Sequence, residues 1–175
     1  MKILVTGFMP FGGETVNPAY EAVRRLPAQI AGADIATVEI PVVYKKGPAA
    51  VEAAIDAEKP DMVLCVGQAG GRAEITPEFV GINYANFRIP DNEGFQPLST
   101  KLEEDGPDAY FATLPVQAMV DACKEKGVPA NVSYSAGTYC CNEVLYELLY
   151  ALDHRHPGVR GGFVHAVSYT HLTLP

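Results

Sequence analysis

Short apolar runs alternate with segments of helical periodicity along most of this chain, and this alternation constrains its fold more than any other feature. Segments suited to strands, apolar or alternating, occur at residues 2–6, 34–43, 62–66, 79–88, 131–135 and 161–165. Helical patterns begin at Pro18, Pro48, Pro115 and Cys141. Strands that alternate with helices of this length predict a largely parallel sheet covered on both faces by helices.

Size, charge and cysteine spacing exclude several classes of partner and location for this chain. The chain has 175 residues, which favours one domain, and its net charge is −8 with Lys and Arg scattered, which argues against nucleic acid or an anionic membrane as a partner. No apolar stretch approaches the roughly 20 residues that a membrane span needs. The chain begins with a strand rather than a signal peptide, and its 4 cysteines lack the spacing of a secreted framework. We therefore expect a cytoplasmic protein with no membrane partner.

In parallel sheets, ligands bind beyond the carboxyl ends of the strands. Four parts of this chain that are rich in glycine or carry reactive side chains fall at such ends. They are residues 7–13, residues 67–78, residues 136–141 and His165. The sequence therefore predicts that these parts converge on a single site.

Cys141 is the strongest candidate for chemistry, because it lies where a helix is expected to begin. Backbone N–H groups at a helix start have no intrahelical partners and favour a thiolate, the nucleophilic form of cysteine. The same N–H groups can hold an oxyanion. The neighbouring Cys140 is a rival on this reasoning alone, whereas Cys65 and Cys123 are expected to be inert buried thiols.

His165 ends an apolar run and is either a buried core histidine or the base that takes the proton of Cys141. A third group usually orients such an imidazole. Glu78, expected in a loop at the correct end of the sheet, could do so. Other carboxylates compete with it for this role: Glu74, Asp91 and Glu93.

The loop at residues 7–13 is rich in glycine but lacks the spacing of a nucleotide-binding motif. Phe8 and Phe11 instead suggest an apolar wall for a small, flat, uncharged group, although both could be ordinary core residues. Arg88 could stabilise an oxyanion, neutralise a carboxylate or form a simple salt bridge.

Five motifs together resemble the pyroglutamyl peptidase I family, the cysteine peptidases that remove N-terminal pyroglutamate. These motifs are residues 7–13 followed by Asn17-Pro18, residues 66–78, residues 88–94, residues 135–142 and residues 161–165. They occur in the family's order, and the likeness extends over residues 1–166.

The resemblance implies Cys141 as nucleophile, because the family's nucleophile directly precedes an asparagine, with His165 as general base and acid and Glu78 as the orienting carboxylate. It also implies the residues that bind the substrate. Phe8, Phe11 and Tyr139 would line the pyrrolidone pocket, Gln68 would recognise the ring and Arg88 would lie near the oxyanion. Neither a metal nor a cofactor is implied.

The resemblance further implies a single α/β domain over residues 1–166, a three-layer α/β/α sandwich with a mostly parallel central sheet. Some members of the family form tetramers, so a homo-oligomer is expected. Members also continue past the histidine into a C-terminal helix, which is missing here. Residues 167–175 continue no pattern and match the translation of a common sequencing-adapter sequence. We therefore predict that they are a non-native tail, that the native part of this sequence ends at Ala166 and that the true C-terminus is missing.

The sequence therefore predicts a cysteine exopeptidase that hydrolyses N-terminal pyroglutamyl residues from peptides through a thioester. The alternative is a catalytically inactive α/β module that binds a small cyclic ligand with the same aromatic wall. A thiol redox protein that uses Cys140 and Cys141 is a third possibility, but a disulfide between adjacent cysteines is strained.

Overall fold

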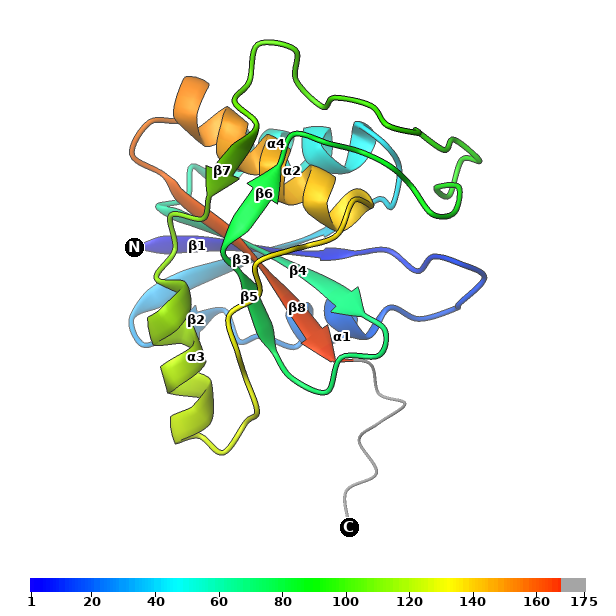
Figure 1. Ribbon diagram of the computed structural model, residues 1–175. Coiled ribbons are helices and arrows are strands. Elements are labelled where there is room, and N and C mark those ends of the chain that lie inside the picture. The colour runs from blue at the N-terminus through cyan, green and yellow to red at the C-terminus, as the bar shows by residue number, and fades with distance from the viewer. Residues whose placement is uncertain (168–175) are drawn as a thin grey trace.

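The computed structural model describes residues 1–167 and has a central sheet of six strands (Figure 1). In spatial order the strands are β2 (Gln29–Ile30), β3 (Ala33–Ile40), β1 (Lys2–Phe8), β4 (Met62–Ala69), β8 (Arg160–Val167) and β5 (Thr76–Glu78). The four central strands are parallel, and the two edge strands run antiparallel to their neighbours. The carboxyl ends of the central strands therefore meet at one edge of the molecule.

Helices cover both faces of this sheet (Figure 1). On one face lie α2 (Lys46–Glu58) and α4 (Cys140–His154), and on the other lie α1 (Pro18–Val23) and α3 (Val116–Glu125), which packs against β5. A second, two-stranded sheet of β6 (Val80–Ile82) and β7 (Ala109–Phe111) packs on α4. The predicted three-layer α/β/α fold with a mostly parallel sheet is confirmed. No helix within residues 1–167 is long and apolar enough to cross a membrane.

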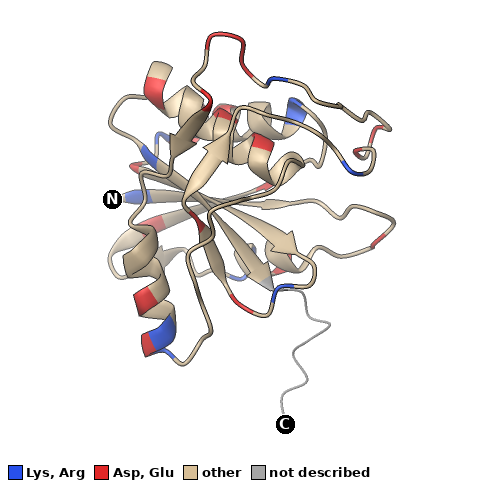
Figure 2. Ribbon diagram, viewed as in Figure 1, with Lys and Arg blue, Asp and Glu red and all other residues tan. Residues whose placement is uncertain are grey.

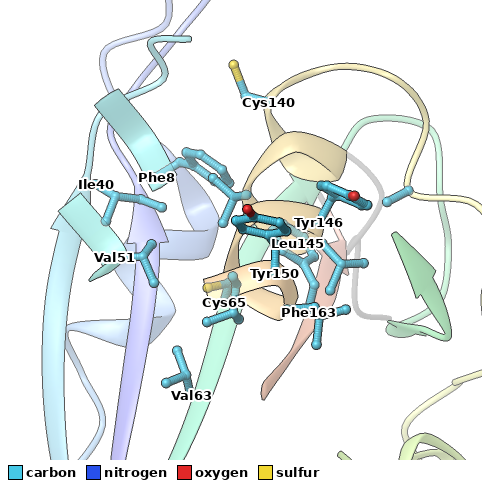
Figure 3. Packing of buried hydrophobic residues seen from close by; sticks show 14 of the residues in the cluster. Phe8, Ile40, Val51, Val63, Cys65, Cys140, Leu145, Tyr146, Tyr150 and Phe163 are labelled. Atoms are coloured by element: carbon cyan, nitrogen blue, oxygen red, sulfur yellow. The ribbon is translucent and has the colours of Figure 1, made fainter. Parts of the chain in front are cut away.

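The main core fills the space between the sheet and the layer of α2 and α4 (Figure 3). Helix α4 is buried along nearly its whole length because apolar side chains occur on most of its faces. Its Tyr146 is fully buried, and the phenol donates to the Pro107 carbonyl at 2.8 Å. The core thus fixes α4, and with it the helix start at Cys140 and Cys141, against the carboxyl ends of the strands.

Two predicted strands are largely wrong. The strand predicted at residues 79–88 is confined to Val80–Ile82, because the Asn83 side chain then accepts from the backbone N–H groups of Leu102 and Glu103 and turns the chain into a loop. The strand predicted at residues 131–135 is reduced to isolated bridges beside β5.

Pro77 explains the second error. The N–H groups of Ile75 and Phe79 donate to carbonyls of the 129–133 segment, and Asn131 and Ser133 donate back to β5 and its flank. The donor between Ile75 and Phe79 on that edge would be residue 77, and proline has no N–H. The ladder is therefore interrupted at its middle. Glu78 itself lies in β5, not in the loop where the sequence placed it.

Val167 ends β8 beside Ala69. It is the only residue of the predicted non-native tail, 167–175, that the structure describes, since residues 168–175 lie outside the described part of the chain.

Candidate active site

A pocket of about 370 Å³ lies at the carboxyl ends of the parallel strands, and all four parts of the chain that were expected to converge contribute to it. The residues that line it and were named from the sequence are Phe8, Phe11, Gln68, Arg88, Tyr139, Cys141 and His165. Glu78 does not line the pocket, because it is fully buried behind His165. The structure thus brings the candidate nucleophile, base and aromatic wall together.

Cys141 lies in the first turn of α4, directly over the end of β4. A Cβ atom on Gly67 would stand 3.2 Å from the Cys141 sulfur, a tight contact, so the glycine gives the thiol room there. The helix is preceded by Tyr139, whose side chain makes no capping hydrogen bond. The first N–H groups of α4 therefore have no cap from Tyr139, and a helix start offers such groups to a bound anion.

His165 and Glu78 are held by neighbouring strands. His165 pairs in register with Gly67 of β4, and Glu78 lies on β5, on the other side of β8. The Nδ1 atom of His165 lies 2.6 Å from Oε1 of Glu78, and both side chains are buried. Because Nδ1 is engaged by the carboxylate, Nε2 is the nitrogen left for chemistry at the pocket.

Arg72 completes this chain of contacts. Its guanidinium lies 2.8 Å from Oε1 of Glu78 and also donates to the Ser135 carbonyl at 3.1 Å. Arg72 lies within the 66–78 motif, but the sequence alone indicates no role for it. A basic residue six positions before the candidate carboxylate was the available signal, and only the path of the 70–76 loop shows that the two side chains meet.

The pKa shifts of Glu78 and His165 both favour the charged forms of these two side chains. Burial alone would raise the pKa of Glu78, but its contacts with His165, Ser133 and Arg72 outweigh burial and lower it. Burial likewise opposes protonation of His165. The charge and hydrogen bond of Cys141, together with those of Glu78, overcome it and raise the pKa of His165 to about 9. His165 is therefore an imidazolium at neutral pH.

The two adjacent cysteines, Cys140 and Cys141, differ in burial and therefore in reactivity. Cys140 is 2% exposed, and burial followed by the nearby charges of Glu143 and Cys141 raises its pKa far above the ordinary range. Burial also raises the pKa of Cys65 to about 12, so both thiols stay protonated. Cys141 is only partly buried and hydrogen-bonds the imidazole.

Aromatic side chains form the walls of the pocket. Phe8 is part of the hydrophobic core and also lines the pocket, so it is both a core residue and part of the apolar wall. The Tyr139 ring lies 4.5 Å from the Phe87 ring and 6.5 Å from the Phe11 ring, measured between centroids. Its hydroxyl donates to the Pro90 carbonyl at 3.1 Å, which holds the ring at the side of the pocket.

The competing carboxylates lie elsewhere. Asp91 accepts backbone N–H groups of the 44 and 93–95 segments, Glu93 pairs with Lys46, and Glu74 accepts from Asn131. Arg88 lines the pocket with an exposed side chain and has no ion pair among the described residues; Arg72, not Arg88, neutralises Glu78.

Some pocket residues were not predicted as site residues. They are Asn17, Val42, Gly70, Ile89, Ala136 and Cys140. Asn17 precedes the helix that begins at Pro18 and caps it, because its Oδ1 accepts from the Ala19 N–H at 3.0 Å. Its Nδ2 also donates to the Met9 carbonyl at 3.1 Å, so one side chain fixes both α1 and the loop that carries Phe11. Within residues 1–167 no cluster of three or more His, Cys, Asp or Glu side chains could hold a metal ion.

We expect Gly67→Ala to impair both folding and activity. The new Cβ would stand 2.6 Å from Phe163 Cζ and 3.2 Å from the Cys141 sulfur, so the ring and the thiol must both move. Overpacking of this kind costs about 1–3 kcal/mol. Chemical denaturation should show that loss, and turnover at a temperature where the variant is folded should still be reduced. Unchanged stability would show that the contact is loose.

Comparison with known proteins agrees with this geometry. A family model described as pyroglutamyl peptidase matches residues 1–171. The pyrrolidone-carboxylate peptidase of Enterococcus faecalis is 54% identical over 165 residues, which span 94% of this chain and 78% of the relative. Pyrrolidone-carboxylate peptidase 1 of Streptococcus pneumoniae is 56% identical, spanning 94% of this chain and 77% of the relative.

Solved structures show the same similarity. The crystal structure of pyroglutamyl peptidase I from Bacillus amyloliquefaciens has a TM-score of 0.94 at 49% identity and matches 95% of this chain and 80% of its own. The pyrrolidone carboxyl peptidase from Thermococcus litoralis has a TM-score of 0.91 at 38% identity, with 95% and 76% matched. This chain therefore belongs to the pyroglutamyl peptidase family of cysteine peptidases.

Proposed function

We propose that this chain removes pyroglutamate from the N-terminus of peptides, with Cys141 as nucleophile, His165 as general base and acid, and Glu78 as the carboxylate that orients the imidazole. One observation carries the proposal: Cys141 lines the same aromatic-walled pocket as His165, whose Nδ1 lies 2.6 Å from Oε1 of Glu78. The family to which the chain belongs supports the same activity.

In the proposed reaction Cys141 acts as the thiolate and His165 as the imidazolium, a form of His165 that its raised pKa favours. The sulfur of Cys141 attacks the carbonyl carbon of the pyroglutamyl residue. The free N–H groups at the start of α4 hold the oxyanion, with Arg88 nearby on the pocket wall. Nε2 of His165 then protonates the departing amine, which leaves a thioester on Cys141.

Water resolves the thioester. Once its proton has gone to the leaving amine, the neutral imidazole accepts a proton from water, and the resulting hydroxide attacks the acyl carbon. Collapse of this second tetrahedral intermediate releases pyroglutamate and restores the thiolate–imidazolium pair. Glu78 stays ionised throughout, because Arg72 and His165 lower its pKa.

The pocket suits the pyroglutamyl ring. The ring is flat and uncharged and carries no free amine, and the walls offered by Phe8, Phe11 and Tyr139 are aromatic. Gln68 lines the same pocket and would recognise the lactam through its amide. A residue that lacks the lactam carbonyl would leave such polar groups unpaired, which is a strong basis for rejection.

A comparison of two arylamide substrates tests the proposed function. Prolyl-arylamide has the same ring size as the pyroglutamyl compound but lacks the lactam carbonyl and carries a charged amine. We expect kcat/KM for the pyroglutamyl compound to be higher by about 10³-fold or more. Equal rates, or no release from the pyroglutamyl compound, would contradict the proposal.

The pH dependence follows from His165. The proton on His165 is needed for the leaving amine, and this proton is lost as pH rises through the His165 pKa of about 9. We therefore expect kcat/KM to hold from neutral pH and to fall on the alkaline side of pH 9. Activity that falls with an alkaline midpoint near the ordinary histidine value would show that the ion pair does not form.

Other properties remain proposals. Basic residues lie scattered among acidic ones over several elements (Figure 2), which supports peptides rather than nucleic acid as substrates. All four cysteines are free thiols, which supports a reducing, cytoplasmic setting. A single domain over residues 1–166 and a homo-oligomer stay predictions.

A further inference from the structure

The start of α4 is anchored in an unusual way. A helix start is normally stabilised by a Ser, Thr, Asp or Asn cap whose side chain occupies the N–H groups of the first turn. Here the cap position is Tyr139, whose side chain makes no capping hydrogen bond. The turn that carries Cys141 keeps its N–H groups free for the substrate and needs an anchor from elsewhere.

Asn142, the residue after Cys141, makes that anchor. It is 1% exposed, and its Oδ1 accepts from the Ile82 N–H at 2.9 Å. Its Nδ2 donates to the Ile82 carbonyl at 2.9 Å and to the Tyr84 carbonyl at 3.0 Å. The side-chain amide therefore pairs with one edge of β6 in place of a strand, while β7 pairs with the other edge.

The packing of β6 on α4 makes this contact possible. A Cβ on Gly81 would stand 3.0 Å from Leu145 Cγ and 3.0 Å from the Tyr146 nitrogen, so a glycine is needed for so close an approach. Two further bonds tie the same segments, since Asn86 N–H donates to the Thr138 carbonyl and the Thr138 hydroxyl donates to the Asn86 carbonyl. Arg88 and Ile89, which line the pocket, follow within three residues.

We propose that Asn142 is a positioning residue for the reaction: its amide fixes the Cys141 turn, with the N–H groups of that turn, against the β6 segment that leads into the Arg88 wall. This proposal rests on the proposed function of Cys141. Asn142 is not among the residues that line the pocket. It sets the distance between nucleophile, oxyanion donors and pocket wall, and a misplacement of about 1 Å in such an arrangement costs on the order of 100-fold in rate.

Asn83 provides a matched control. It is also a buried asparagine, 7% exposed, whose amide hydrogen-bonds backbone groups. Its Oδ1 accepts from the N–H groups of Leu102 and Glu103, and its Nδ2 donates to the Glu103 and Gly106 carbonyls. It follows β6 directly but holds a loop that does not line the pocket. Asn142→Ala and Asn83→Ala thus remove the same chemistry from the same neighbourhood.

We expect Asn142→Ala to lower kcat by about 100-fold while KM changes by less than about threefold, because the turn loses its geometry and the pocket keeps its walls. Asn83→Ala, compared at matched distance below its own melting temperature, should keep kcat within about threefold of the wild type. Equal kcat losses in the two variants, or a kcat for Asn142→Ala within threefold of wild type, would overturn the proposal.

Asn142→Asp gives a second readout and serves if Asn142→Ala does not fold. A carboxylate there keeps the acceptor for Ile82 N–H but places charge against two carbonyls, and a protonated carboxyl regains one donor. Its activity relative to wild type should rise as pH falls from 8 toward about 5, whereas that of Asn83→Asp should not. Parallel curves for the two variants would contradict a role specific to the Cys141 turn.

Failure of the proposed function is seen separately, as absence of turnover by the wild type. In that case the rate of iodoacetamide alkylation, mapped to Cys141 by mass spectrometry, still tests the positioning. Asn142→Ala should slow this rate at neutral pH, because the thiolate depends on the alignment with His165, and Asn83→Ala should not. Equal rates in both variants would overturn the inference.

Discussion

Cys141→Ala should abolish release of a fluorophore from a pyroglutamyl-arylamide, with a loss of about 10⁴-fold or more in kcat. Among the described residues, two thiols line the pocket, and burial raises the pKa of Cys140 so that it stays protonated, which leaves Cys141 as the nucleophile beside the imidazole. Removal of the sulfur leaves the pocket and the N–H groups at the start of α4, so substrate binding should survive.

Cys140→Ser is the matched control for this variant. The two residues are adjacent in the first turn of α4, but Cys140 is buried within the core cluster. We expect Cys140→Ser to retain most of the turnover, with a modest loss of stability from placing a hydroxyl in an apolar site. Equal loss of activity from both substitutions would contradict the assignment of Cys141 as the nucleophile.

Glu78→Gln should lower kcat by about 10²–10⁴-fold, the range seen when the orienting carboxylate of such a triad is neutralised. Oε1 of Glu78 contacts His165 Nδ1 at 2.6 Å and the Arg72 guanidinium at 2.8 Å. An amide removes the charge that helps to raise the pKa of His165 and leaves Arg72 uncompensated beside the imidazole, so that pKa should fall. The alkaline limb of the pH profile should therefore move to lower pH.

Glu147→Gln controls for the loss of a buried carboxylate. Glu147 is 7% exposed on α4 and pairs with Lys45, and it does not line the pocket. The substitution should keep kcat within about threefold of wild type and leave the pH profile in place. If Glu78→Gln were to retain wild-type kcat and an unmoved alkaline limb, Glu78 would not orient His165.

Much of the site could be predicted because it depends on local pattern. The apolar runs gave the positions of β1, β4 and β8, and parallel strands bring their carboxyl ends together, which placed Phe8, Gln68 and His165 near one another. The apolar periodicity predicted a helix from Cys141, and in the structure α4 begins one residue earlier, at Cys140.

The rest depends on contacts between residues that are distant in sequence or on the path of a loop. The strand predicted at residues 131–135 failed because Pro77, on the neighbouring chain segment, lacks a donor for it. The Arg72–Glu78 ion pair and the contact of Asn142 with Ile82 join side chains whose meeting is set by loops and packing, which no periodicity encodes.

Protection of Cys141 during turnover would test the central claim most directly. With an activated pyroglutamyl ester in excess, acylation should outrun hydrolysis of the thioester, so most of the enzyme should carry the acyl group. Iodoacetamide pulses read by mass spectrometry should find Cys141 blocked, with the added mass of one pyroglutamyl group, until the ester is exhausted. Continued turnover with Cys141 free to alkylate throughout would contradict the proposed mechanism.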